Sequence, residues 1–234
     1  MALFTISDPH LSFGTDKPMD IFGKNWENHA QRIKDNWERL VSRDDTVVIP
    51  GDISWAMGLA NAEADLRFIN DLPGRKLIGK GNHDYFWGTV NKMTAFIDHA
   101  GITTISFLYN NAYLIDNKIV CGTRGWMSEF GVKADDERII KREAQRLELS
   151  LQQGMKLKEE NPDAKLVVFT HYPIVFGDFI NYEFIDILYK YEVNTVYYGH
   201  LHNIKESQLD KSYLGIDFHL IAGDYIGFDP VLVE

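Results

Sequence analysis

The stretch from Thr46 to Asp52, TVVIPGD, decides the fold that the sequence predicts. Four consecutive β-branched residues indicate a short buried strand, and Pro50 ends it because proline cannot continue a central strand. The same design, a short apolar run followed by a polar turn, occurs upstream at 2–7 and downstream at 76–79. Each of these runs is expected to be a buried strand.

A segment with helical spacing follows each of these strands. The three segments lie at residues 25–41, 60–71 and 89–99, and the first carries Trp26 on its apolar face. Residues 11–24 are expected to be a loop. Strand, loop and helix thus alternate three times, which is typical of a parallel sheet with helices packed on its faces.

The rest of the chain predicts more strands and two more helices. A long charged helix is expected at 134–160, with an apolar stripe from Ile140 to Met155 that faces the core, and a shorter helix at 182–191. The expected strands are 103–107, 112–115, 118–121, 166–170, 195–198, 213–222 and 226–233. No repeat or linker divides the chain, so residues 1–234 are expected to form one domain.

The composition excludes several classes of protein. The chain is 45% hydrophobic and 25% charged, and it has one cysteine, which excludes an internal disulfide. No apolar run approaches the ~20 residues that a membrane helix needs, and no signal peptide is apparent, so we expect a cytoplasmic protein. A net charge of −10 disfavours an extended nucleic-acid surface, but it leaves a small phosphate substrate open. The apolar helix faces do not distinguish a monomer from a dimer.

Five turns that follow apolar strands carry residues that bind metals. They are Asp8-Pro9-His10, Gly51-Asp52, Gly81-Asn82-His83-Asp84, His171-Tyr172-Pro173 and Gly199-His200-Leu201-His202. In parallel α/β sheets, ligands bind beyond the carboxyl ends of the strands, so we expect these turns to meet. Carboxylate, imidazole and amide oxygen suit divalent Mn, Fe, Zn, Co or Ni. Each motif alone is weak, but their joint occurrence at strand ends predicts a metal site.

In the order D-x-H, G-D, G-N-H-D, H and G-H-x-H, these motifs resemble those of the calcineurin-like metallophosphoesterases, from Asp8 to His202. The resemblance implies a four-layer α/β/β/α sandwich, in which two mostly parallel or mixed sheets face each other between helices. It also implies two divalent metal ions. The implied ligands are Asp8, His10 and His202 for one ion, and Asn82, His171 and His200 for the other, with Asp52 as the bridge.

The same resemblance implies the hydrolysis of a small phosphate mono- or diester. A hydroxide held by metal would attack phosphorus, His83 would protonate the leaving oxygen, and Asp84 would orient His83 through a hydrogen bond. A purely structural, buried imidazole is the alternative for His83. Three other functions stay open: a nuclease or nucleotide phosphodiesterase with the same chemistry, a hydrolase of another bond, and a catalytically silent protein-binding scaffold of the same fold.

The residues that bind the substrate are harder to predict. Gly51-Asp52 is not followed by the Asp-Arg-Gly type of turn that is common in the family, so Arg124, directly after a strand, is the candidate phosphate ligand. An ordinary surface arginine is the alternative. Trp55 and Tyr85 could wall a pocket for a flat leaving group, or they could pack beneath the turns. Asp224 follows a glycine but has no nearby histidine, so a plain turn is expected there.

Overall fold

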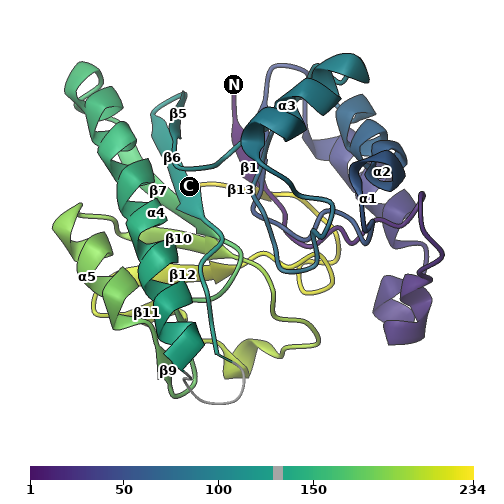
Figure 1. Ribbon diagram of the computed structural model, residues 1–234. Helices are drawn as coiled ribbons and strands as arrows, with labels where there is room; N and C mark the ends of the chain where they lie inside the picture. The colour runs from purple at the N-terminus through teal and green to yellow at the C-terminus, as the bar shows by residue number, and fades with distance from the viewer. Residues whose placement is uncertain (129–133) are drawn as a thin grey trace.

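The computed structural model describes residues 1–128 and 134–234, and its longer strands form two sheets that lie face to face (Figure 1). The first sheet has the strand order β13-β1-β2-β3-β4. Strands β1 to β4 are parallel, and β13 pairs antiparallel with β1. The bounds are Leu3–Thr5 for β1, Thr46–Ile49 for β2, Arg75–Ile78 for β3, Ile105–Phe107 for β4 and Val231–Leu232 for β13.

The second sheet has the order β11-β12-β10-β7-β6-β5, and a separate hairpin joins β8 to β9. Its four inner strands are parallel, and both edge strands are antiparallel to their neighbours. The bounds are Ala112–Ile115 for β5, Lys118–Thr123 for β6, Lys165–Thr170 for β7, Val175–Phe176 for β8, Phe179–Ile180 for β9, Thr195–Tyr198 for β10, Ser212–Tyr213 for β11 and Ile216–Leu220 for β12.

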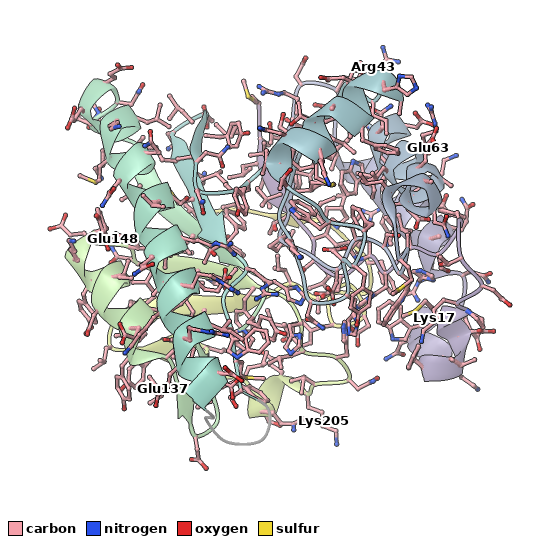
Figure 2. All side chains as sticks on the ribbon, in the orientation of Figure 1. Lys17, Arg43, Glu63, Glu137, Glu148 and Lys205 are labelled. Carbon is pink, nitrogen blue, oxygen red and sulfur yellow. The ribbon has the colours of Figure 1, made fainter. Side chains whose placement is uncertain are left out.

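Helices cover the outer face of each sheet. Helices α1 (His29–Leu40), α2 (Leu59–Asp71) and α3 (Val90–His99) cover the first, and α4 (Ala134–Glu160) and α5 (Tyr182–Lys190) cover the second (Figure 1). The charged side chain of Glu63 on α2 points outward from these layers, whereas Glu148 on α4 pairs with Lys190 of α5 (Figure 2). Short 3-10 helices lie at Met19–Phe22, Lys24–Trp26 and Glu206–Gln208.

Three apolar cores separate the four layers. On β2, Val47 packs toward the helices of the first half, while Val48 faces the second sheet. The third core joins the second sheet to α4 and α5, through residues such as Leu151 and Phe184. Because both faces of the central strands are buried, their sequences are continuous apolar runs rather than alternating ones. The predicted α/β/β/α sandwich is therefore confirmed.

The first predicted helix begins later than expected. It starts at His29, after Asn28 in a left-handed conformation with φ 52°, and residues 24–26 form a 3-10 turn. A second 3-10 turn lies within the segment expected to be a loop. Trp26 consequently leaves the apolar face of the helix and packs by its edge against His10 and His202.

The C-terminal strands were also predicted too long. Leu214 and Gly215, with φ of 50° and 80°, form a turn, so the expected strand 213–222 is an antiparallel hairpin of β11 and β12. Only Val231–Leu232 of the expected strand 226–233 pairs with a sheet. On α4, the apolar stripe is buried at Leu151, but Met155 is 37% exposed.

A membrane-spanning helix is not found within the described ranges, since none of their helices is both long and apolar enough.

Lys76 on β3 is unusual because its charged side chain is fully buried. Its ammonium group donates hydrogen bonds to the carbonyl oxygens of Asn70 at 3.0 Å, Leu72 at 2.6 Å and Gly74 at 2.9 Å. These carbonyls lie at and beyond the C-terminus of α2, where a positive charge also favours the helix dipole. Burial lowers the pKa of Lys76 to about 8, so the group is still largely charged at neutral pH. It anchors α2 to β3.

Replacing Lys76 by Met should keep the packing volume but leave three carbonyl groups without their donor. An unsatisfied buried group costs about 1–3 kcal/mol, so we expect a loss of at least about 2 kcal/mol and a thermal midpoint at least about 5 °C lower. The exposed neighbour Arg75→Met is the matched control and should leave the midpoint nearly unchanged. Equal midpoints for the two variants, measured by calorimetry, would contradict the anchoring role.

Candidate metal centre

The five predicted ligand turns meet where the two sheets join. Ser7, just beyond β1, forms a parallel bridge with Ala222, just beyond β12. The Ser7 amide donates to the carbonyl of Ile221 at 2.8 Å, and the Gly223 amide donates to the carbonyl of Ser7 at 2.9 Å. This bridge places the carboxyl ends of strands from both sheets at one edge, as expected for open α/β sheets.

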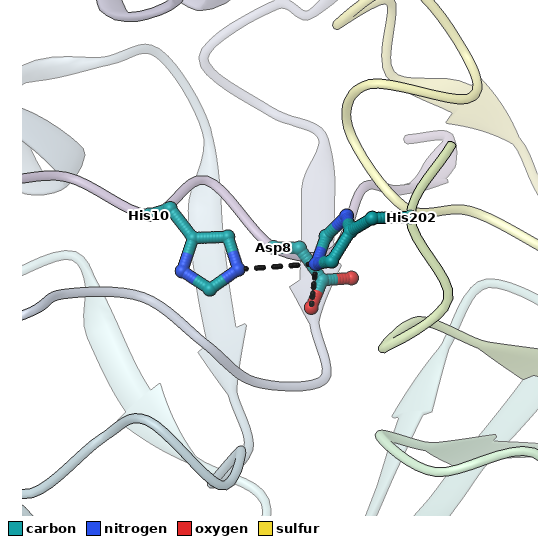
Figure 3. Close-up of side chains that lie close together, drawn as sticks. All are labelled: Asp8, His10 and His202. Atoms are coloured by element: carbon teal, nitrogen blue, oxygen red, sulfur yellow. Dashed lines mark hydrogen bonds and ion pairs between the residues drawn. The ribbon is translucent and has the colours of Figure 1, made fainter. Parts of the chain in front are cut away.

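The first group of converging side chains contains Asp8, His10 and His202 (Figure 3). The Nε2 atoms of the two histidines lie 3.2 Å apart, although the residues are 192 positions apart in the chain. Oδ1 of Asp8 lies 4.0 Å from Nε2 of His202. Two ring nitrogens and one carboxylate oxygen thus face a common point.

The second group contains Asn82, His171 and His200. Oδ1 of Asn82 lies 2.6 Å from Nε2 of His171 and 2.9 Å from Nδ1 of His200. Each contact joins atoms from different sheets, because Asn82 follows β3 whereas the histidines follow β7 and β10. A neutral oxygen and two ring nitrogens therefore converge beside the first group.

Asp52 lies between the two groups. Its Oδ2 atom is 3.6 Å from Nε2 of His10 and 3.5 Å from Nε2 of His171. Its other oxygen accepts a hydrogen bond from the His83 amide at 2.8 Å, just as Oδ2 of Asp8 accepts from the His200 amide at 3.0 Å.

The free oxygens of the two aspartates test whether this site fits metal ions. Oδ1 of Asp8 and Oδ2 of Asp52 are both buried without a hydrogen-bond partner. A buried carboxylate oxygen without a partner is costly, and a cation removes that cost. The nitrogen and oxygen donors around these atoms are those that borderline divalent ions prefer. The residues present therefore fit a divalent metal centre.

Four of the predicted ligands have a strained, left-handed backbone conformation. Asp8, His10, Asp52 and His200 have φ of 57°, 44°, 52° and 70°, in the left-handed region that residues other than glycine seldom adopt. Neighbouring glycines allow the close approach: a Cβ atom on Gly81 would lie 2.0 Å from Oδ1 of Asp52. These strained backbone conformations lower the local stability, and they direct the side chains inward.

Burial sets the protonation of the ligands. It raises the pKa of Asp8 to about 6 and that of Asp52 well above its ordinary value, where the neighbouring charge of Asp84 adds to the effect. It lowers the pKa of His10 and His171 well below the usual range, and that of His200 to about 3. These three imidazoles are therefore neutral at pH 7 and able to bind a metal.

Sequence reasoning missed Asp224, for which only a plain turn was predicted. Its Oδ1 accepts a hydrogen bond from Nδ1 of His202 at 2.8 Å, and its Oδ2 accepts from the Asn203 amide at 2.9 Å. Burial works to lower the pKa of His202, but this hydrogen bond and the charge of Asp8 raise it. The bond leaves Nε2 as the ligand atom, as carboxylates beside metal-binding histidines do. The available signal was a Gly-Asp pair after a strand, as in the Asp52 turn.

The predicted hydrogen bond from Asp84 to His83 is wrong. The Asp84 carboxylate instead accepts four backbone amides: Gly81 at 2.7 Å, Asp52 at 2.9 Å, Ile53 at 2.8 Å and Ser54 at 3.2 Å. These bonds leave it no free position for an imidazole, because each oxygen already accepts two donors. Burial raises the pKa of Asp84 to about 6, while the four amides act in the opposite direction.

His83 and Trp55 line an apolar pocket of about 150 Å³ beside the first ligand group, together with Trp26 and Phe22. The Trp55 ring stacks on His10 with centroids 4.9 Å apart, and its centroid lies 4.3 Å from that of His83. Burial lowers the pKa of His83, and the charges of His202 and Lys17 add to that shift. Tyr85 touches His83 by its edge but is 54% exposed, so it lies at the outer rim.

Arg124 lies beside the second ligand group. Its backbone carbonyl accepts the amides of His171 at 3.0 Å and Tyr172 at 2.9 Å. Its guanidinium lies over the Trp126 ring and 3.7 Å from the carboxylate of Glu143, and it lines a second cavity. Arg124 is thus next to the second ligand group, whereas Trp55 contacts His10 of the first group.

The chain shares folds and motifs with known proteins. It is 39% identical to the Gene 66 protein of Mycobacterium phage L5 over 80 residues. The aligned segment covers 33% of this chain and only 37% of the phage protein. A protein of unknown function from Aquifex aeolicus, AQ665, has the same fold, with a TM-score of 0.52 and 18% identity over 99% of this chain and 95% of its own. The protein TT1561 of Thermus thermophilus has a TM-score of 0.50 and 11% identity, over 99% of this chain and 97% of its own.

The family model of the calcineurin-like phosphoesterases matches residues 1–203, which include all seven predicted ligands and His83. Membership of this family implies metal-dependent hydrolysis of a phosphoester. The sequence, the sandwich of two sheets and the converging ligand turns thus agree, and the chain belongs to the calcineurin-like phosphoesterase family.

Proposed function

We propose that this protein is a two-metal phosphoesterase that hydrolyses a small phosphate mono- or diester. The two buried, unpaired carboxylate oxygens of Asp8 and Asp52, each facing ring nitrogens of two sheets, are the observation that carries the proposal. In this proposal Asp8, His10 and His202 hold one ion, Asn82, His171 and His200 hold the other, and Asp52 bridges them. Manganese is the ion we would test first, since it accepts this mixture of oxygen and nitrogen ligands.

Divalent ions would neutralise charge on the phosphate and make water a better nucleophile at neutral pH. The other roles belong to side chains of the chain itself. His83, half-buried among the residues that line the apolar pocket, would donate a proton or a hydrogen bond to the leaving oxygen. Asp84 positions the turns of Asp52 and Asn82 rather than the imidazole of His83.

The apolar pocket favours a flat leaving group. Trp26 and Trp55 flank His10, and Lys17 lies 4.5 Å above the Trp55 ring, where it adds positive charge. Aromatic walls of this kind bind planar groups by stacking. A nucleotide phosphodiesterase is therefore the second candidate function, with the same metal chemistry.

Asp52→Asn and His83→Ala separate the metal-binding role from the proton-transfer role. We expect Asp52→Asn to lose bound manganese and the hydrolysis of bis-p-nitrophenyl phosphate and p-nitrophenyl phosphate, because its neutral amide is a weaker bridge. His83→Ala should keep the metal but lower kcat by about 100-fold or more. Metal content and rates are measured together, with the exposed His99→Ala as the control. A fully loaded wild-type protein that cleaves neither ester would refute the function.

Metal affinity should fall with acid because of the aspartates and His202, whose pKa values are raised, and not because of His10 and His171. A carboxylic acid whose pKa is raised to about 6 keeps its proton below that pH, so an ion must displace it. Below pH 6 we expect affinity to drop about tenfold per pH unit for each proton displaced. His10 and His171 are already neutral there and add no loss. Calorimetric titration of Mn²⁺ at pH 5 and 7, in two buffers, measures both affinity and proton release. Equal affinities at the two pH values would contradict this.

Asp224→Asn should weaken metal binding without changing the ligand set. The amide oxygen can still accept from Nδ1 of His202, but the negative charge that makes Nε2 a better ligand is gone. We expect about 10- to 100-fold weaker binding of one ion. Asp229→Asn, which changes an exposed carboxylate paired with Arg39, is the matched control. Two unchanged binding constants for Asp224→Asn would exclude this role.

A further inference from the structure

A second cavity lies next to Arg124, whose carbonyl accepts the His171 amide, and it shares no lining residue with the apolar pocket. It has a volume of about 260 Å³, and the side chains of Lys80, Arg124, Arg142 and Arg146 contribute to its walls. Glu143 is the one acidic residue among the described residues that line it. The walls therefore carry an excess of three positive charges, in a chain whose net charge is −10.

Glu143 organises the arginines rather than neutralising them. It is fully buried, and one of its oxygens lies 2.7 Å from Arg146, 3.4 Å from Arg142 and 3.7 Å from Arg124. Its other oxygen accepts from the Thr123 hydroxyl at 2.9 Å. One carboxylate cannot use the five N–H donors of each of three guanidinium groups. The cavity thus holds pre-oriented N–H donors that Glu143 does not use.

The Arg124 side chain has one of these unused donors. Its Nε atom is buried and has no hydrogen-bond partner. A buried donor of a charged group without a partner is costly, so the site is incomplete as it stands.

Two residues of the cavity wall are neighbours of candidate metal ligands. Lys80 is two residues from Asn82, so their Cα atoms lie within about 7 Å. The Arg124 carbonyl accepts a hydrogen bond from the amide of His171 at 3.0 Å. The cavity wall therefore adjoins the turns that carry Asn82 and His171.

We propose that this basic cavity binds a second phosphoryl group of the substrate, so that the preferred substrate carries two phosphoryl groups. The inference rests on the proposed phosphoesterase function. Guanidinium groups bind phosphoryl oxygens in pairs of hydrogen bonds, and the volume is several times the ~30 Å³ that one water molecule takes in the liquid. The group that reacts would lie at the metal centre, and the second would lie between Arg124, Arg142 and Lys80.

The first experiment measures phosphate binding to the metal-free protein, where the aspartates of the centre repel anions. Inorganic phosphate is titrated calorimetrically into the wild type, the double variant Arg142→Gln/Arg146→Gln, and Lys80→Gln. We expect at least a tenfold loss of affinity in both variants. Lys80→Gln leaves the contacts of Glu143 intact and guards against misfolding of the double variant. Arg138→Gln, on the same helix but 83% exposed and outside the cavity, is the matched control.

The second experiment uses the manganese-loaded protein. Methylenediphosphonate and methylphosphonate are compared as inhibitors of bis-p-nitrophenyl phosphate hydrolysis. We expect at least a tenfold preference of the wild type for the diphosphonate, and a loss of this preference in Lys80→Gln.

Three outcomes decide the matter. The anion site is excluded if phosphate binds the wild type and the variants equally, or if it does not bind the metal-free wild type. Phosphate binding in the cavity without a diphosphonate preference indicates a site for free phosphate and overturns the assignment to the substrate. A loaded protein without any hydrolysis refutes the proposed function, whereas a loss of phosphate binding in the variants would still support the anion site.

Discussion

The buried carboxylate of Asp84 is the constraint on which the geometry of the metal centre depends. It accepts backbone amides from the turn after β2 and from the turn after β3, and so fixes one turn against the other. The Asp52 side chain then accepts the amide of His83 across the same gap. Asp52 and Asn82 consequently reach the centre from neighbouring strands at fixed positions, although both are on loops. Rigid placement of this kind is what a metal site requires of its surroundings.

The sequence predicts those features that depend on local pattern. Four β-branched residues of β2 are buried on both faces, so their apolar run identifies an inner strand. Polar turns after such strands then locate the ligands, since a parallel sheet brings its carboxyl ends together. The left-handed turn at Leu214 and Gly215, in contrast, divides the segment 213–222 that was expected to be one strand, because Gly215 was not taken as a turn signal.

Other features depend on contacts between distant segments. Asp224 meets His202 through the bridge between Ser7 and Ala222, which joins the first strand to the end of the chain. Asp84 was assigned to its sequence neighbour His83, but burial favours the amides that would otherwise lack partners. Trp26 leaves the helix because the chain turns at Asn28, and its ring then becomes a wall of the site. None of these contacts follows from spacing along the chain.

The candidate ligands come from two halves that each have their own core beneath their own helices. Asp8, His10, Asp52 and Asn82 extend from the first sheet, and three histidines from the second. An ion shared between these groups would be a removable cross-link between the halves, comparable in position to a disulfide across two packed layers. The ease with which the sheets separate should therefore depend on metal supply, so that the ions proposed for catalysis would also set the lifetime of the folded chain.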